Sequence, residues 1–247
     1  MNVVPRRRYE IGSRRAWVAV AGACVALASA PRPAAAQWPV VPSSRTYWLS
    51  GAAAIAAGIA FDTQMRDLAL RNHTPGLDRL AGGLDPFGRA KYIVPALVAG
   101  YVLPLALRQH RWADAALRVG LAYAASDAIE SVLKPLVGRH RPTATGNAWT
   151  FHPIATTDEW HSFPSAHTVH AFSLAAAISD EAQNRWVTLA SYGTAGLVAS
   201  QRIYRQAHWT SDVLASAVLA IATSRTTVHW LAGHGLGRLL GPLVPAP

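Results

Sequence analysis

Cysteine is almost absent from this chain of 247 residues, since Cys24 is the only one. It lies within residues 1–36, which have the pattern of a removable leader, so the predicted mature chain has no cysteine. Disulfide bonds, thiolate metal sites and cysteine nucleophiles are therefore excluded from any function of the mature protein.

Charged residues are also scarce, at 15% of the chain against 51% hydrophobic residues. This balance, with a mean hydropathy of +0.15, indicates either a membrane protein or a helical protein with a large apolar interior. The formal net charge is +10, but residues 1–36 hold six of the arginines and only one acid, Glu10. The remaining 17 basic and 12 acidic side chains give +5, which predicts no nucleic-acid partner and suits a mildly basic pocket for a small anion.

Long apolar runs are missing as well. The uncharged runs at 46–61 and 92–107 are each 16 residues long, short of the roughly 18–20 residues that a membrane-spanning helix needs. The apolar segment 113–134 contains charged residues such as Asp114 and Asp127, which suit a protein interior better than lipid. The sequence therefore leaves two arrangements open: a bundle that partly crosses the membrane, or a periplasmic bundle that rests against it.

Residues 1–36 have the features of an export signal. A basic segment, RRRYEIGSRR, precedes the apolar stretch AWVAVAGACVALASA, and the small residues AAA end at Ala36 before Gln37. The stretch SRRAW, from Ser13 to Trp17, is similar to a twin-arginine signal, although an ordinary secretory signal with paired arginines explains it equally well. Either route predicts a protein in the periplasm, or in the inner membrane with its site facing the periplasm.

The remaining residues, 37–247, are long enough for one domain and predict an all-α bundle of about six core helices. Apolar blocks rich in alanine, leucine and valine are separated by short polar links, and none shows the period of two that is typical of a strand. The predicted helices lie at 46–61, 92–107, 113–134, 165–180, 186–203 and 211–225, with a further tail helix at 226–240.

Basic residues gather where the predicted helix at 113–134 ends, in the stretch KPLVGRHRP that starts at Lys134. Lys134 and Arg141 lie seven residues apart, and the prolines and glycine around them predict a helix exit with restricted backbone freedom. Any single cation here could simply complement the helix dipole. A cluster of four, counting Arg139 and His140, favours the binding of an anion instead.

The stretch HSFPSAHTVHAF, which starts at His161, places three histidines where a polar loop becomes an apolar helix. Ser165 is a predicted helix cap, so free backbone N–H groups of the first turn point outward and favour an anion. His167 lies in that turn, within reach of such an anion, and His170 follows one turn later as an expected core residue. A metal site made of the three histidines is a weaker alternative, because their spacing matches no common ligand pattern.

A third polar cluster lies in QRIYRQAHWTSD, between the predicted helices at 186–203 and 211–225. Arg202 ends one helix, His208 lies in the link, and Asp212 begins the next helix four residues later. At that spacing we expect Asp212 to accept a hydrogen bond from one ring nitrogen of His208, which leaves the other nitrogen free as a nucleophile.

The order of the three clusters resembles the type-2 phosphatidic acid phosphatase family, whose site is shared with the vanadium haloperoxidases. The match lies within residues 113–225 and consists of Lys-x6-Arg-Pro, Pro-Ser-Ala-His and Arg-x5-His-x3-Asp. Two positions depart from the family pattern, because Ala166 replaces a glycine before the histidine and Gln201 replaces a serine before the arginine. The first change adds one methyl group beside the expected phosphate, and the second removes a hydroxyl.

The resemblance implies a helical phosphatase that needs neither a metal nor another cofactor and forms a phosphohistidine intermediate. His208 is the expected nucleophile, His167 the proton donor and acceptor, and Asp212 the residue that orients His208. The expected phosphate-binding residues are Lys134, Arg141, Ser165, Ala166 and Arg202, with Ala166 contributing its backbone.

The substrate class is less clearly indicated. An alanine- and leucine-rich bundle with tryptophans at helix ends favours a phosphorylated lipid or isoprenoid at a membrane surface. A soluble phosphoester, hydrolysed by a non-specific periplasmic acid phosphatase, is the alternative. A vanadate-dependent haloperoxidase with the same pocket is a second hypothesis, and a binding protein with an inactive pocket is a third. Residues that recognise the rest of the substrate are expected in the links at 62–91 and 143–162.

Overall fold

The computed structural model describes residues 45–234, so the predicted export signal at 1–36 lies outside this range. Residues 45–234 form seven α-helices, two short 3₁₀ helices and no β-strand, which confirms the predicted all-α class. The α-helices are α2 (Arg45–Arg71), α3 (Pro75–Leu84), α4 (Ala90–Ala106), α5 (His110–Val137), α6 (Ala166–Ala182), α7 (Arg185–Tyr204) and α8 (Thr210–His234). The 3₁₀ helices are η1 (Asp85–Gly88) and η2 (Asp158–Trp160).

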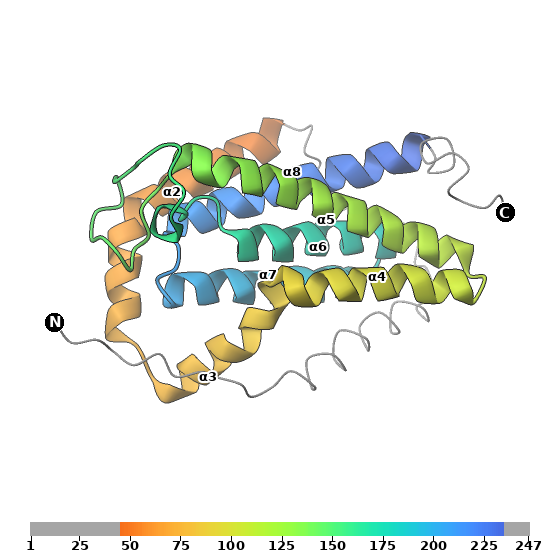
Figure 1. Ribbon diagram of the computed structural model, residues 1–247, viewed down its shortest axis with the longest axis horizontal. Coiled ribbons are helices and arrows are strands. Elements are labelled where there is room, and N and C mark those ends of the chain that lie inside the picture. Colours follow the sequence, from red (N-terminus) through yellow and green to blue (C-terminus); the bar gives the residue numbers. More distant parts are fainter. Residues whose placement is uncertain (1–44, 235–247) are drawn as a thin grey trace. The chain divides into compact units, whose positions relative to one another are not determined.

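Helix α6 is the centre of the bundle, because it packs against α5, α7 and α8 (Figure 1). Helix α4 lies along α5, α2 packs on α8, and α3 packs on α7. The buried contacts consist mainly of alanine and valine, and one cluster between α5, α6 and α8 contains Val119, Ala122, Ala177 and Val228. Small side chains let helix backbones approach closely, so this alanine-rich sequence can form a densely packed interior.

The prediction of a link at 62–91 is wrong, because most of this segment is helical. Helix α2 continues to Arg71, and α3 and η1 occupy most of the remainder. The hydroxyl of Thr74 caps α3 by accepting a hydrogen bond from the Leu77 N–H at 3.3 Å, and a proline occupies the start of the helix. The polar residues that suggested a link therefore lie on helix faces, where one of them, Asp62, is buried.

The loop of residues 138–165 is folded back against the end of α5. Gly138 has a left-handed φ of 57°, and a Cβ at this position would lie 1.8 Å from the carbonyl oxygen of His152. Only glycine tolerates both the conformation and the close approach. Two backbone hydrogen bonds hold the loop in place, from His152 N–H to the Gly138 carbonyl at 2.7 Å and from Ile154 N–H to the Pro135 carbonyl at 2.9 Å.

The final described helix is longer than predicted. Helix α8 runs without interruption from Thr210 to His234, so the tail helix expected at 226–240 is, as far as residue 234, a continuation of it. None of the helices between residues 45 and 234 is both long enough and apolar enough to cross a membrane.

Candidate active site

The three polar clusters of the sequence meet at one end of the bundle, where α5 and α7 end and α6 and α8 begin (Figure 1). His208 lies among them and is 3% exposed. Burial lowers the pKa of His208 well below its ordinary value, and the nearby charges of Arg202, Arg141 and Lys134 lower it further. The site is therefore built around a buried, neutral imidazole that is surrounded by three cations.

The position of the proton on His208 follows from its hydrogen bond. Nδ1 lies 2.5 Å from the carbonyl oxygen of Ser162. A carbonyl oxygen can only accept, so Nδ1 carries the hydrogen and a neutral ring then has no hydrogen on Nε2. The Nε2 lone pair is thus available for attack on an electrophile, which is the state that a nucleophilic histidine requires.

Asp212 does not make the predicted hydrogen bond to His208. Its Oδ2 instead accepts hydrogen bonds from the Ser162 hydroxyl at 2.5 Å and from the Trp209 N–H at 3.0 Å. Ser162 therefore links Asp212 to His208: its hydroxyl donates to Asp212, and its carbonyl accepts a hydrogen bond from His208. The residue that joins the carboxylate to the imidazole is Ser162, which lies in the 138–165 loop. The spacing between His208 and Asp212 along the chain cannot reveal a contact with so distant a segment.

Arg139 joins this arrangement to α2 through a buried ion-pair network. Its Nη1 donates to Asp212 Oδ1 at 2.5 Å, and its Nη2 donates to Asp62 Oδ2 at 2.8 Å. The backbone carbonyl of Ala148 and the hydroxyl of Ser211 accept further hydrogen bonds from the same guanidinium. All five donors of an arginine can be used in such a network, so Arg139 is committed to structure and is not available to an anion.

The other cations of the site have fewer partners inside the protein. Arg202 Nη1 lies 3.4 Å from Asp85 Oδ1, and its buried Nε has no hydrogen-bond partner among residues 45–234. Burial lowers the pKa of Arg202 to about 10, an effect that Asp85 opposes and Arg141 reinforces. Arg141 donates to Asp158 and to the Ala207 carbonyl, and Lys134 pairs with Glu130. Bringing a phosphate dianion among these cations would relieve their mutual repulsion.

His167 is supported by Asp85, a residue that the sequence analysis did not single out. His167 Nε2 lies 3.3 Å from Asp85 Oδ1, and the same oxygen contacts Arg202. Burial lowers the pKa of His167, while Asp85 acts in the opposite direction and Arg202 lowers it further. The carboxylate itself is held ionised, because contacts with His167 and Arg89 outweigh burial and keep the pKa of Asp85 well below its ordinary range.

About half of the chain matches a known protein family. A family model described as the PAP2 superfamily matches residues 115–235. The segment from residue 115 to residue 235 belongs to the PAP2 superfamily. No curated protein matches the sequence significantly.

Two solved structures share the PAP2 fold with this chain. The first is the crystal structure of the first transmembrane PAP2-type phosphatidylglycerolphosphate phosphatase from Bacillus subtilis, with a TM-score of 0.60 and 19% identity over 77% of this chain and 96% of that chain. The second is the crystal structure of Aquifex aeolicus LpxE, with a TM-score of 0.54 and 20% identity over 68% of this chain and 95% of that chain. At these identities the similarity establishes the fold.

Ser165 does not cap the PAP2 helix α6 in the predicted manner. It is fully buried, its hydroxyl accepts a hydrogen bond from the Thr168 hydroxyl at 3.0 Å, and its N–H donates to the Ser216 hydroxyl at 2.8 Å. The side chain accepts no capping hydrogen bond from the helix backbone. The N–H groups of Ala166 and His167, in the first turn, still lack acceptors within the helix and can serve an anion.

The three histidines of the second cluster take separate positions. His161 Nε2 lies 2.9 Å from the Ala155 carbonyl, and His170 lies between Gly88 and Asp127. The three rings therefore do not face one common point, and the metal alternative has no geometric support. No group of three or more potential His, Cys, Asp or Glu ligands occurs within residues 45–234.

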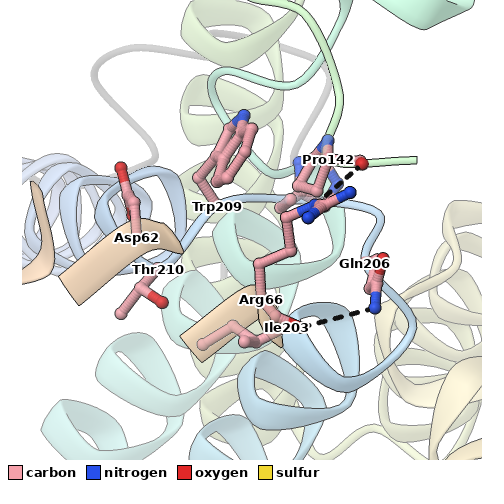
Figure 2. Close-up of a pocket in the computed structure, with 8 residues that line it drawn as sticks. Asp62, Arg66, Pro142, Ile203, Gln206, Trp209 and Thr210 are labelled. Atoms are coloured by element: carbon pink, nitrogen blue, oxygen red, sulfur yellow. Dashed lines mark hydrogen bonds between the residues drawn. The ribbon is translucent and has the colours of Figure 1, made fainter. Parts of the chain in front are cut away.

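A small pocket borders the PAP2 site on the side of α2 (Figure 2). It is lined by Asp62, Arg66, Pro142, Ile203, Gln206, His208, Trp209 and Thr210. Figure 2 shows Arg66 reaching toward Pro142, whose carbonyl accepts a hydrogen bond from Arg66 Nε at 3.3 Å, while Gln206 donates to the Arg66 carbonyl at 3.4 Å. Helix α2 thus connects the first and third clusters and supports the segment that carries His208.

Proposed function

We propose that this protein is a metal-independent phosphatase that hydrolyses phosphate monoesters through a phosphohistidine on His208. The observation that carries the proposal is a neutral imidazole with a free Nε2, buried among Arg141, Arg202 and Lys134. Phosphoryl transfer requires mainly correct positioning and neutralisation of the charge on the equatorial oxygens. Three fixed cations beside an activated nucleophile supply both.

In the proposed first step, His208 Nε2 attacks phosphorus and the bond from phosphorus to the ester oxygen breaks. Lys134, Arg141 and Arg202 hold the phosphoryl oxygens, and the hydroxyl of Ser165 and the backbone of Ala166 add hydrogen bonds. His167 gives its proton to the departing oxygen, so the alcohol leaves uncharged. Asp212 acts through Ser162 and keeps the His208 ring in its reactive orientation and tautomer.

In the second step, His167 has lost its proton and accepts one from a water molecule. The resulting hydroxide attacks phosphorus, the phosphorus–nitrogen bond breaks, and the electron pair returns to His208 Nε2. Inorganic phosphate is the second product, and both histidines regain their initial protonation states. Asp85 favours this cycle because a carboxylate beside His167 stabilises the imidazolium form that donates the proton.

A phosphorylated lipid or isoprenoid is the favoured substrate class. Large apolar side chains are exposed on several helices of the bundle, including Phe61 on α2, Leu103 on α4, Val132 on α5 and Trp186 on α7. Such surfaces suit contact with a membrane, and the structurally similar Bacillus subtilis protein is described as a transmembrane phosphatidylglycerolphosphate phosphatase. We therefore propose an exported protein that associates with the inner membrane, with its site facing the periplasm.

The proposal predicts that the purified protein releases phosphate from 4-nitrophenyl phosphate in excess EDTA and that vanadate inhibits the release. A metal-dependent enzyme would lose activity on chelation. EDTA does not remove basic side chains, so an enzyme that neutralises charge with three of them should keep its activity. Phosphate release from a panel of lipid phosphates and soluble phosphoesters would define the substrate class. No hydrolysis across the whole panel would refute the proposed function, and halide oxidation with peroxide and vanadate would favour a haloperoxidase instead.

The role of Asp85 predicts a specific change in pH dependence. Asp85 raises the pKa of His167, so Asp85→Asn should lower it, and less of the general acid will be protonated at a given pH. The basic limb of the kcat/KM profile should therefore move to lower pH. The measurement is kcat/KM for an alkyl phosphate between pH 4 and 9. An unchanged basic limb would show that Asp85 does not act on the proton donor.

A further inference from the structure

His170, one turn beyond His167 on α6, has an unusual set of partners for a core histidine. It is 5% exposed, its Nδ1 lies 2.8 Å from the Gly88 carbonyl, and its Nε2 lies 2.6 Å from Asp127 Oδ1. The Gly88 carbonyl can only accept, and so can an ionised Asp127. Both ring nitrogens must then donate, which makes His170 an imidazolium ion paired with Asp127.

The state of Asp127 supports this assignment. The hydrogen bond from His170 is the largest cause that lowers the pKa of Asp127, and it outweighs partial burial. The ring of Tyr123 packs near the imidazole, with 5.0 Å between the ring centroids. Among the charged or titratable groups, Lys134 on α5 acts on Asp127, and His167 on α6 lies near His170. Glu130 acts on the neighbouring Tyr123, Asp85 acts on His167, and Arg89 directly follows Gly88 in the chain.

The Gly88 carbonyl connects His170 to the proposed general acid. A Cβ added to Gly88 would lie 2.5 Å from Cδ2 of His167, so the glycine backbone packs directly against that ring. Gly88 ends η1, and Asp85 begins the same short helix. The hydrogen bond from His170 therefore holds η1 so that Gly88 contacts the His167 side chain while Asp85 contacts its Nε2.

We propose that His170 is a positioning residue, which, anchored by Asp127, clamps η1 onto His167 and so fixes the geometry of proton transfer. This inference rests on the proposed phosphatase function and adds His170 and Asp127 to its machinery. His170 touches neither substrate nor reacting atoms. Its effect passes through the Gly88 carbonyl to the ring contact and to the Asp85 carboxylate.

Substitutions that keep one hydrogen bond at a time test the clamp. The amide nitrogen of asparagine can replace Nδ1 of a histidine, and that of glutamine can replace Nε2. His170→Asn should thus retain the bond to Gly88, and His170→Gln should retain only the bond to Asp127. We expect kcat/KM for an alkyl phosphate to fall about 30-fold in His170→Gln and by no more than about fivefold in His170→Asn.

The leaving group separates positioning of the proton donor from a general loss of structure. 4-Nitrophenol leaves readily without a proton, so kcat/KM for 4-nitrophenyl phosphate should fall only about threefold in His170→Gln. Equal losses with both substrates, or equal losses in the asparagine and glutamine variants, would overturn the proposal. His229→Gln on α8, where His229 is 58% exposed and pairs with Asp180, is the matched control and should leave both rates unchanged.

An NMR measurement distinguishes failure of this inference from failure of the proposed function. Ring ¹⁵N shifts of the wild-type protein at neutral pH should show both nitrogens of His170 protonated, and His170→Gln should shift the titration of His167. A ring of His170 without a hydrogen on Nδ1 could not donate to the Gly88 carbonyl and would overturn the clamp even in an active phosphatase. Because Asp127 is partly exposed, Asp127→Asn is a milder variant for use where His170→Gln does not fold, and it should also shift the His167 titration.

Discussion

His208→Asn is expected to reduce kcat by at least about a thousandfold while the protein remains folded. The asparagine amide can take the place of Nδ1 and donate to the Ser162 carbonyl, so the one hydrogen bond of His208 is kept. No atom is then available at the position of Nε2, and a phosphorus–nitrogen bond cannot form. The variant thus removes the nucleophile without leaving a buried carbonyl unsatisfied.

Two measurements check this result. Steady-state phosphate release gives kcat. Quenching in alkaline detergent after brief incubation with ³²P-labelled substrate preserves a phosphohistidine, which is then recognised as a base-stable phosphoprotein that loses its label in acid. Wild-type protein should retain label and His208→Asn should not. His110→Asn, at an exposed position at the start of α5, is the control and should behave as wild type. Turnover by His208→Asn within tenfold of wild type would exclude His208 as the nucleophile.

The parts of the site that the sequence predicted are those with local signals. Lys134, Arg141 and His167 lie at helix ends that proline, glycine and the change from polar to apolar residues mark in the sequence. The end of a helix exposes unpaired backbone groups, so its position in a bundle has chemical consequences that can be anticipated. The fold class followed from the same pattern, because alanine-rich blocks without strand periodicity leave only helices.

The parts that were missed depend on pairing across long distances in the chain. Asp85 supports His167 from a segment that was predicted to be a link, and Asp62 reaches Arg139 from α2. Neither pairing has a local signature, since each acid could equally have lain on the surface. A carboxylate next to an apolar helix, as in the case of Asp62, indicates only that some partner exists. Three-dimensional packing decides which partner it is.

Arg139 illustrates the energetic side of these long-range contacts, and replacing it should have the largest effect on stability. Asp62 is 2% exposed and Asp212 is fully buried, and Arg139 is the cation that contacts both. Arg139→Met would leave two buried carboxylates without a counter-charge, which costs about 3–5 kcal/mol of the free energy of unfolding. Loss of activity should accompany the loss of stability, because Asp212 also fixes Ser162 and through it His208.

The loss of stability in Arg139→Met should depend on pH, and this dependence identifies its cause. Burial already raises the pKa of Asp212, and Arg139 opposes this, so Arg139→Met should raise it further. A carboxyl group with a pKa above its unfolded value binds a proton more tightly when folded, so its destabilising effect appears as pH rises through the folded pKa and disappears at low pH. The free energy of unfolding, measured with urea, should therefore fall further below the wild-type value at pH 8 than at pH 5 in Arg139→Met.

Two comparison variants make the prediction specific to the buried pair. Arg141→Met removes a cation whose carboxylate partner, Asp158, is 87% exposed, so it should lower activity with a change in unfolding free energy of no more than about 1 kcal/mol. Adding Asp62→Asn to Arg139→Met removes one of the two stranded charges and should recover part of the lost stability. Equal destabilisation by Arg139→Met and Arg141→Met, or no recovery in the double variant, would show that lost packing rather than uncompensated buried charge is responsible.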